Sequence, residues 1–445
     1  MNERNVLIGI FGILAVLTYF LEVIAGEYSP AVVAGFLLVG SSLSSIIFFY
    51  HSHKQEKLPS DDLKKEKNLI YNPYVSIVIP AKNEEKVIAE TVNNIMQIDY
   101  KKEDGSLNYE LIVIDDGSTD MTPNILSNLK QKYSNLYIHH RLPLIKSNKA
   151  SALNSAFPLY AGEILCVFDA DAKVNPDFLN QIIPYFKDVT VGAIQAKKQI
   201  VNGKENLLTS AQENELCMAM ELEDQRDKNN SAVCLWGNGM LVRKEALMCV
   251  GGWNNNALTE DSDMSTNLHL HNWQVRHCSL AVVYEEAINN WNGFLKQRFR
   301  WAEGNIRCCL NYFVQLMHTP MPITKKIDML SSILAFALPI WLVTDMMFLF
   351  SDKTKERDIF LSILMYVIVA LLGGLWINIT SGFKVLKHKE PKTAIKSFVN
   401  IINNAFYSLH WVPLALTVLG KIFLNYQPSL WNKTEHGKVS LKVKS

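Results

Sequence analysis

The chain has 445 residues, too many for one ordinary core, which predicts a domain of a few hundred residues with further segments. With 44 basic and 43 acidic residues its formal net charge is +1, so composition does not indicate nucleic-acid binding. The seven cysteines are scattered and lack a C-x-x-C spacing, which disfavours a disulfide framework or zinc site and favours a reduced, cytoplasmic setting.

The N-terminal end of the chain is apolar. Residues 6–24 and 30–50 each approach the ~20 residues that cross a bilayer, so residues 1–50 are predicted to form two transmembrane helices. A charged linker follows at 51–73 and contains five lysines. Because basic residues next to a span favour the cytoplasmic side, we expect residues 74–317 to form a cytoplasmic domain on the cell (inner) membrane.

The C-terminal end is apolar as well. Residues 327–350 and 359–380 predict two spans, and residues 398–424 are a possible further one that several polar residues weaken. A lysine-rich loop and the basic tail at 426–445 both indicate the cytoplasmic side, which conflicts with a single crossing between them. Residues 318–425 are therefore predicted to hold two or three transmembrane or interfacial helices, and the side on which the tail lies is left open.

The central region alternates strands with helices. Apolar, β-branched runs predict strands at 75–79, 110–114 and 164–168, and amphipathic runs predict helices at 84–96 and 122–133. Such strands separated by helices indicate parallel β-α-β units, and thus an α/β fold. Sheets of this kind bind ligands at the carboxyl ends of their strands.

Acidic groups stand where that sheet would gather a ligand. They are Asp115-Asp116 after the second strand, Asp169 and Asp171 after the third, and Glu260-Asp261 farther on. Carboxylates brought together at strand ends repel one another unless a cation lies among them. Mg²⁺ takes one or two carboxylates and completes its shell with water and phosphates. Each group alone could be a turn or a helix cap, but their order after successive strands favours a metal and phosphate site.

A basic and aromatic motif, Gln297-Arg298-Phe299-Arg300-Trp301, follows the acidic groups. It could form an amphipathic helix whose Lys296, Arg298 and Arg300 meet lipid head groups. It could also bind substrate phosphates, because arginine is a fork-shaped donor to such groups.

Five motifs in this order resemble the processive family-2 glycosyltransferases, which include cellulose, hyaluronan, chitin and poly-N-acetylglucosamine synthases. That family carries D-D-G, K-x-x-A-L-N, D-x-D, T-E-D and Q-x-x-R-W. The matching residues are Asp115-Asp116-Gly117, Lys149 to Asn154, Asp169-Ala170-Asp171, Thr259-Glu260-Asp261 and Gln297 to Trp301. The resemblance covers residues 74–317 and implies a GT-A type nucleotide-diphospho-sugar transferase domain, with a mostly parallel mixed sheet and helices on both faces.

The resemblance also implies roles for single residues. The nucleotide-sugar would be bound by Asp115, Asp116, Lys149, Asp169, Gln297 and Arg300, and Asp169 and Asp171 would hold Mg²⁺ or Mn²⁺. Asp261 would be the catalytic base, with Glu260 beside it. Trp301 and Trp236 would contact the acceptor, although a membrane-interface anchor and a plain turn are the respective alternatives.

Two activities follow from the resemblance. The main prediction is inverting transfer from a UDP-sugar to a growing β-linked polysaccharide, cellulose-like or poly-N-acetylglucosamine, at the membrane. The alternative is a lipid glucosyltransferase that makes a β-monoglucosyl-diacylglycerol, because residues 300–304 and 310–313 are also similar to cyanobacterial synthases of that lipid. An inactive scaffold is disfavoured, since every expected carboxylate is present. Membrane lipid and an accessory membrane subunit are the expected partners, and the sugar and the linkage stay open.

Overall fold

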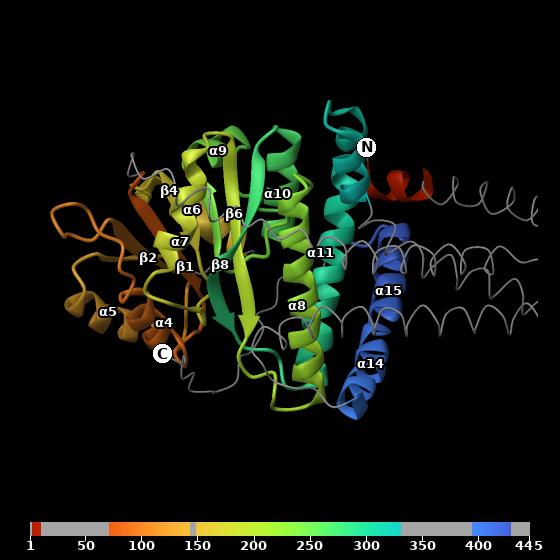
Figure 1. Cartoon of the computed structure of the whole chain (residues 1–445), viewed down its shortest axis with the longest axis horizontal. Coiled ribbons are helices and arrows are strands. Elements are labelled where there is room, and N and C mark those ends of the chain that lie inside the picture. The colour runs from red at the N-terminus through yellow and green to blue at the C-terminus, as the bar shows by residue number, and fades with distance from the viewer. Residues whose placement is uncertain (1, 10–70, 143–147, 331–393, 429–445) are drawn as a thin grey trace, which may run out of the picture. The chain divides into compact units, whose positions relative to one another are not determined.

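The computed structural model describes residues 2–9, 71–142, 148–330 and 394–428 (Figure 1). Three of the predicted transmembrane segments, 30–50, 359–380 and most of 6–24, lie outside these residues, as do most of 327–350, the linker up to residue 70 and the tail beyond 428. The described residues fall into two compact units. We call residues 71–205 and 219–293 the sheet unit, and residues 2–9, 206–218, 294–330 and 394–428 the helical unit.

The sheet unit is built on one eight-stranded sheet with the order β3-β2-β1-β4-β7-β6-β8-β5. The strands are β1 Val75–Ala81, β2 Tyr109–Asp115, β3 Leu136–His140, β4 Ile164–Val167, β5 Lys173–Val174, β6 Val191–Ile200, β7 Met240–Arg243 and β8 Gln274–Glu285. The first four strands are parallel, as the alternating pattern predicted. Beyond them β7 runs antiparallel to both β4 and β6, and β8 is parallel to β6, which makes the sheet mixed.

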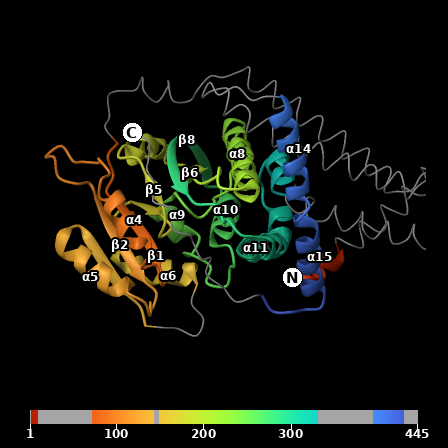
Figure 2. The ribbon, with the colours of Figure 1, turned by 90° about the horizontal axis from the view of Figure 1, so that it is seen from below.

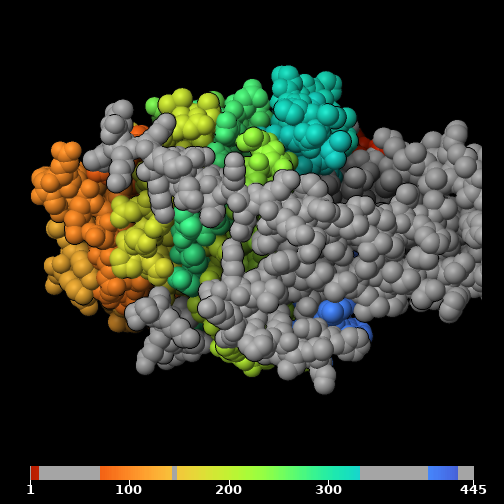
Figure 3. Space-filling model, in the orientation of Figure 1, coloured from red at the N-terminus to blue at the C-terminus, as the bar shows by residue number. Residues whose placement is uncertain are grey.

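Helices cover both faces of this sheet (Figures 1 and 2). They are α4 Ile88–Ile95, α5 Thr122–Lys132, α6 Lys149–Ser155, α7 Phe178–Ile182, α9 Lys244–Cys249 and α10 Glu260–Leu270, with two 3-10 turns at Phe157–Leu159 and Ile183–Lys187. Successive residues of a strand point to opposite faces, so Ile77 and Ile79 join a core with α4, α5 and α7, while Val78 joins one with α6, α9 and α10. In the space-filling view the first residues of the sheet unit, coloured orange, lie directly beside its yellow segment (Figure 3).

The first helix starts later than its sequence pattern predicted. The pattern placed the start at Glu84, whereas α4 begins at Ile88. The intervening backbone is held by the loop after β2: the Glu84 N–H donates to Thr122 Oγ1 at 2.8 Å and the Glu85 N–H to Asp120 Oδ2 at 3.2 Å. These bonds tie the carboxyl ends of β1 and β2 together, which is where the acidic groups lie.

The helical unit consists of α11 Trp291–His318 from Phe294 onward, α14 Ala394–Ser408, α15 Trp411–Phe423, the first part of α8 Leu207–Lys228 and the helical residues 3–9. Its core joins apolar residues of α11 and α15 to the N-terminal helix: Val6, Leu7, Ala302, Ile306, Leu310, Val418, Leu419 and Ile422. Among the described residues, only the stretch Val399–Phe423 is long and apolar enough to cross a membrane. It includes the turn at 409–410 between α14 and α15.

Candidate active site

The acidic groups occupy the positions that the strand pattern predicted. Asp115 is the last residue of β2, and Asp169 follows β4 by two residues. Because β2 and β4 pair with β1 on its two sides and all three are parallel, both groups emerge at the same edge of the sheet. Glu260 and Asp261 open helix α10, where the helix dipole favours negative side chains.

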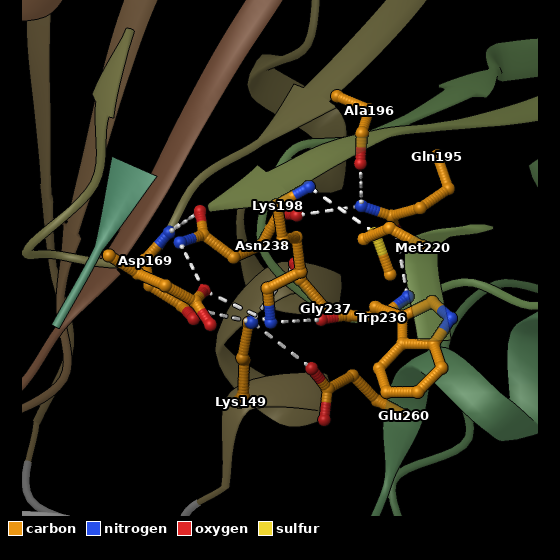
Figure 4. Close-up of polar contacts among 11 residues, drawn as sticks. Lys149, Asp169, Gln195, Ala196, Lys198, Met220, Trp236, Gly237, Asn238 and Glu260 are labelled. Carbon is orange, nitrogen blue, oxygen red and sulfur yellow. Dashed lines mark hydrogen bonds and ion pairs between the residues drawn. The ribbon is translucent and has the colours of Figure 1, made fainter. Parts of the chain in front are cut away.

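Lys149 brings two of these groups together (Figure 4). Its Nζ lies 2.6 Å from Asp169 Oδ1 and 3.2 Å from Glu260 Oε1, and it donates to the Gly237 carbonyl at 3.4 Å. Burial disfavours the ammonium, but the carboxylates of Asp169, Glu260 and Asp261 outweigh burial and raise the pKa of Lys149 above its usual range. The lysine is therefore a fixed positive charge at the centre of the acidic groups.

Local hydrogen bonds fix the helix that carries Lys149. Asn148 and Ser151 form a capping box at the start of α6, in which the Ser151 N–H donates to Asn148 Oδ1 at 2.8 Å. Asn154, the last residue of the K-x-x-A-L-N motif, donates to the Trp253 carbonyl at 2.6 Å and accepts from the Trp253 N–H at 3.0 Å. The motif thus ties α6 to the loop that leads into α10, and so to Glu260.

Asp261 faces the backbone of a loop, residues 236–239, that we call the WGNG loop. A Cβ added to Gly237 would lie 3.0 Å from Asp261 Oδ2 and 3.6 Å from Lys149 Nζ. Burial and then the neighbouring Glu260 carboxylate raise the pKa of Asp261 to about 6, although Lys149 opposes them. A carboxylate with that pKa is suited to accept a proton near neutral pH.

Gly237 is therefore a sensitive position. Its φ of +77° and the short approach to Asp261 mean that Gly237→Ala introduces both backbone strain and a contact at the carboxylate. We expect a loss of ~1–3 kcal/mol in the free energy of unfolding and at least tenfold lower activity. Thermal unfolding and initial rates measure both effects. Gly105→Ala is the control, because Gly105 has a similar φ of +81° but open space at its Cβ. Equal rate losses in the two variants would contradict a special role for the close approach of Gly237 to Asp261.

The WGNG loop is held by side chains that the sequence did not single out. Gln195 of β6 accepts the Trp236 N–H at 2.7 Å and donates to the Asn238 carbonyl at 2.9 Å. Asn238 accepts the Asp169 N–H at 3.2 Å and donates to Glu285 Oε2 at 3.3 Å. These bonds link the loop to both the D-x-D group and the end of β8.

Lys198 is the third side chain that holds the WGNG loop. Its Nζ lies 3.0 Å from Glu285 Oε2. The same ammonium donates to the Trp236 carbonyl at 3.2 Å (Figure 4). The strand that carries it, β6, pairs with β7 and β8 in the mixed half of the sheet, which has no β-α-β signature. The sequence therefore offered no pattern from which this residue or Glu285 could be identified.

Trp236 is half-buried, and a hydrogen bond from its indole N–H holds the orientation of its ring. The indole N–H donates to Glu223 Oε1 at 3.2 Å, and the other oxygen of Glu223 accepts the Cys234 N–H at 2.9 Å. Glu223 is fully buried, and burial raises the pKa of its carboxyl. A contact between Trp236 and an acceptor stays a prediction, but the ring has the fixed orientation that such a contact needs.

Asp115 and Asp116 each lie against a basic residue at the end of β3. His140 Nδ1 is 2.9 Å from Asp115 Oδ2, and the Ser118 N–H donates to the other oxygen at 3.1 Å. Arg141 donates to Asp116, and both side chains of that pair are buried. The two carboxylates are thus held in fixed orientations, and nucleotide binding by them stays a prediction.

The Q-x-x-R-W residues belong to the helical unit. Gln297, Arg300 and Trp301 are half-buried on α11, and their contacts with substrate stay a prediction. Arg298 differs from the expectation that it meets lipid head groups. It is only 5% exposed and donates to Glu215 Oε2 at 2.6 Å and to the Tyr407 hydroxyl at 2.9 Å.

Comparison with known proteins decides the family. Residues 73–304 match the family model described as "Glycosyltransferase like family 2". The chain belongs to the family 2 glycosyltransferases. It is 33% identical over 82% of its length to the beta-monoglucosyldiacylglycerol synthases of Nostoc sp. and Synechocystis sp., covering 76% and 75% of those proteins.

The fold of this family 2 glycosyltransferase also has a solved counterpart. The mannosyltransferase PcManGT from Pyrobaculum calidifontis, solved with GDP-Man and Mn²⁺, aligns with a TM-score of 0.56 and 17% identity. The alignment covers 89% of this chain and 99% of that one. This likeness shows the GT-A-like α/β fold, in agreement with the fold class predicted from the sequence.

The donor set of the glycosyltransferase fits a divalent cation of the Mg²⁺ or Mn²⁺ type. In the described part of the chain, no three or more His, Cys, Asp or Glu side chains are grouped to hold a metal ion. Asp169 and Asp171 supply two carboxylates at the sheet edge, and the Asp169 side chain is 42% exposed. One or two carboxylates are the usual protein contribution to a Mg²⁺ site that substrate phosphates and water complete.

Proposed function

We propose that this enzyme transfers glucose from UDP-glucose to the free hydroxyl of diacylglycerol at a membrane, forming β-monoglucosyldiacylglycerol. The observation that carries this proposal is the 33% identity to synthases of that lipid over 368 residues. That length exceeds the 73–304 range shared with the whole family, so the likeness extends into the flanking segments. A polysaccharide product, the main prediction from the motifs, has weaker support because it rests on features that family 2 enzymes share.

Asp261 acts as the general base in this proposal. Its carboxylate takes the proton of the acceptor hydroxyl while that oxygen forms a bond to the anomeric carbon and the bond to UDP breaks. One displacement opposite the leaving group inverts an α-linked donor into a β-linked product. The pKa of about 6 leaves most of the carboxylate charged, and able to accept a proton, at neutral pH.

Positive charge near the leaving diphosphate comes from Lys149, since its ammonium lies at the same sheet edge as Asp169. Asp169 and Asp171 would hold the divalent cation, which when bound neutralises the charge that develops on the departing UDP. Asp115 and Asp116 would bind the nucleoside, and Trp236 would contact the acceptor. Gln297 and Arg300 would bind the diphosphate, and Trp301 the acceptor.

The Asp171→Ala variant tests the metal site. We expect it to lose metal-dependent UDP binding by at least about 10-fold, because one of two protein ligands is removed. Isothermal titration with UDP, with and without Mn²⁺, measures the effect. Asp99→Ala is the control, since the Asp99 side chain is 63% exposed and pairs only with Lys101 among the ion pairs described. Unchanged metal-dependent binding in Asp171→Ala would refute the site.

Product analysis tests the whole proposal. The purified protein in nanodiscs is given Mg²⁺ and radiolabelled UDP-glucose or UDP-N-acetylglucosamine, with and without diacylglycerol. We expect label from UDP-glucose to move as a one-sugar lipid, and only when diacylglycerol is present. High-molecular-weight label without added lipid would instead establish a polysaccharide synthase, the second candidate, which the Q-x-x-R-W motif favours.

A further inference from the structure

Lys149 holds the carboxylate that the metal is expected to use. Its Nζ is 2.6 Å from Asp169 Oδ1, the shortest of its three polar contacts, and its side chain is only 15% exposed. Asp169 is the same residue that supplies half of the protein's carboxylate ligands for a divalent cation. One carboxylate group therefore faces two competing cations.

The two cations oppose one another at such short range. The repulsion between an ammonium and a divalent ion is twice that between two unit charges at the same distance. Salt screens it weakly, because the lysine is largely buried. Glu260 attracts both cations but lies on the opposite side of Lys149 from Asp169 (Figure 4). Negative charge added beside Lys149 and Asp169 would relieve the conflict, and the diphosphate of the donor brings that charge.

We propose that Lys149 makes metal binding depend on the nucleotide: it holds Asp169 in the empty enzyme and releases it when a nucleoside diphosphate offers the ammonium other oxygens. The inference rests on the proposed metal site and adds that tight binding of the cation requires the nucleotide. A free divalent cation binds weakly, and the cation and nucleotide bind tightly together.

The surroundings of Lys149 allow this exchange without a large rearrangement. The lysine keeps Glu260 and the Gly237 carbonyl as partners when Asp169 turns away. The Asp169 side chain is partly exposed, so it can change rotamer without disturbing the core. The capping box fixes the backbone of α6, so that only side chains need to move.

A purely structural ion pair is the competing explanation, and Lys198 provides the matched control. Lys198 is also a buried lysine, paired with Glu285 at 3.0 Å and donating to a carbonyl of the WGNG loop. Neither of these contacts involves Asp169. Removing either lysine deletes one positive charge near the site, but only Lys149 competes for the metal ligand.

The test is a Mn²⁺ titration of the full-length protein in nanodiscs, followed by electron paramagnetic resonance and corrected for Mn²⁺ bound to free UDP. For the wild type we expect UDP to raise the Mn²⁺ affinity by about 10- to 100-fold. In Lys149→Met the affinity without nucleotide should rise by about tenfold or more, and the UDP effect should shrink by the same factor. Lys149→Arg keeps the charge and should behave like the wild type, as should Lys198→Met.

Two results would overturn the inference. One is a wild-type protein that binds Mn²⁺ equally tightly with and without UDP, a measurement that needs no variant. The other is a folded Lys149→Met, judged by thermal unfolding, whose affinity without nucleotide is unchanged or lower. Neither sugar nor acceptor is present, so a different product leaves this test intact. Loss of Mn²⁺ binding in Asp171→Ala, together with no effect of Lys149→Met, would support the metal site but refute the proposal that Lys149 couples metal binding to the nucleotide.

Discussion

The Asp261→Asn variant should transfer sugar about 10²- to 10⁴-fold more slowly than the wild type, the usual contribution of a general base. UDP-glucose binding should change little, because none of the described contacts of Asp115, Asp116 and Asp169, the carboxylates proposed to bind the nucleotide, involves Asp261. Initial rates at saturating donor and isothermal titration with UDP separate the two effects. Asp263→Asn is the matched control: it lies in the same first turn of α10, but its carboxylate accepts from Asn254 at 2.9 Å.

The same residue sets the expected pH dependence. Only the charged form of Asp261 can take a proton, and its pKa in the free enzyme is about 6. The value of kcat/KM should therefore fall about tenfold per pH unit below pH 6 and level off above it. A profile that stays flat down to pH 5, or an Asp261→Asn enzyme with wild-type kcat, would remove Asp261 from the role of base.

Stability gives an independent check that Asp261→Asn is folded. The pKa of Asp261 is raised from 3.8 to about 6, so folding disfavours the charged carboxylate. This penalty is absent well below pH 3.8, develops as the pH rises towards 6, and is complete above it. Since asparagine is neutral, the variant should melt higher than the wild type at pH 8, and the difference should shrink towards pH 4. Such a gain would mark a residue kept for chemistry at some cost in stability.

The parallel half of the sheet could be predicted because local patterns specify it. Runs such as 75–79 and 110–114 are β-branched, buried on both faces and separated by amphipathic helices, which leaves few alternatives. The carboxylates then follow from where those strands end. Strand β6 offers no such pattern, because its last residues include Lys197, Lys198 and Gln199. Its paired residues in β7 and β8 also lie far along the chain, as in Gln195 with Met240 and Ile200 with Glu285.

The partners of the site residues depend on the same long-range pairing. The resemblance to known motifs indicated Lys149 but not that it bridges Asp169 and Glu260, because Asp169 lies in the loop after β4 and Glu260 opens α10. Gln195 and Asn238 are ordinary polar residues in sequence. Only the approach of β6 to the WGNG loop makes them supports of the site.

The Q-x-x-R-W motif on α11 shows a limit of prediction from family resemblance. Family resemblance directs attention to Arg300, yet the structure buries Arg298. A four-residue spacing places Phe294, Arg298 and Ala302 on one helix face, and all three are buried. A charged residue between two apolar positions at that spacing was a readable signal that Arg298 has a buried partner.

Arg298→Met should lower the melting temperature markedly, because Arg298 is a buried charge on α11 with an acidic partner. The guanidinium lies 4.3 Å from the Trp301 ring centroid and contacts Glu215, which also accepts the Trp411 indole N–H at 3.1 Å and the Tyr407 hydroxyl at 2.6 Å. Without Arg298 the Glu215 carboxylate stays largely buried, and the ion pairs of the described residues give it no other cation. Breaking one side of a buried pair costs about 3–5 kcal/mol.

Tryptophan fluorescence during thermal unfolding in detergent measures this effect, because the Arg298 guanidinium lies over the rings of both Trp301 and Trp411. We expect a decrease of at least about 5 °C for Arg298→Met, and within about 1 °C for the control Lys296→Met, whose side chain is exposed on the same helix. The double variant Arg298→Met with Glu215→Gln should recover part of the loss, since no lone charge remains. Equal losses in Arg298→Met and Lys296→Met would show that this pair does not hold the helices of the unit together.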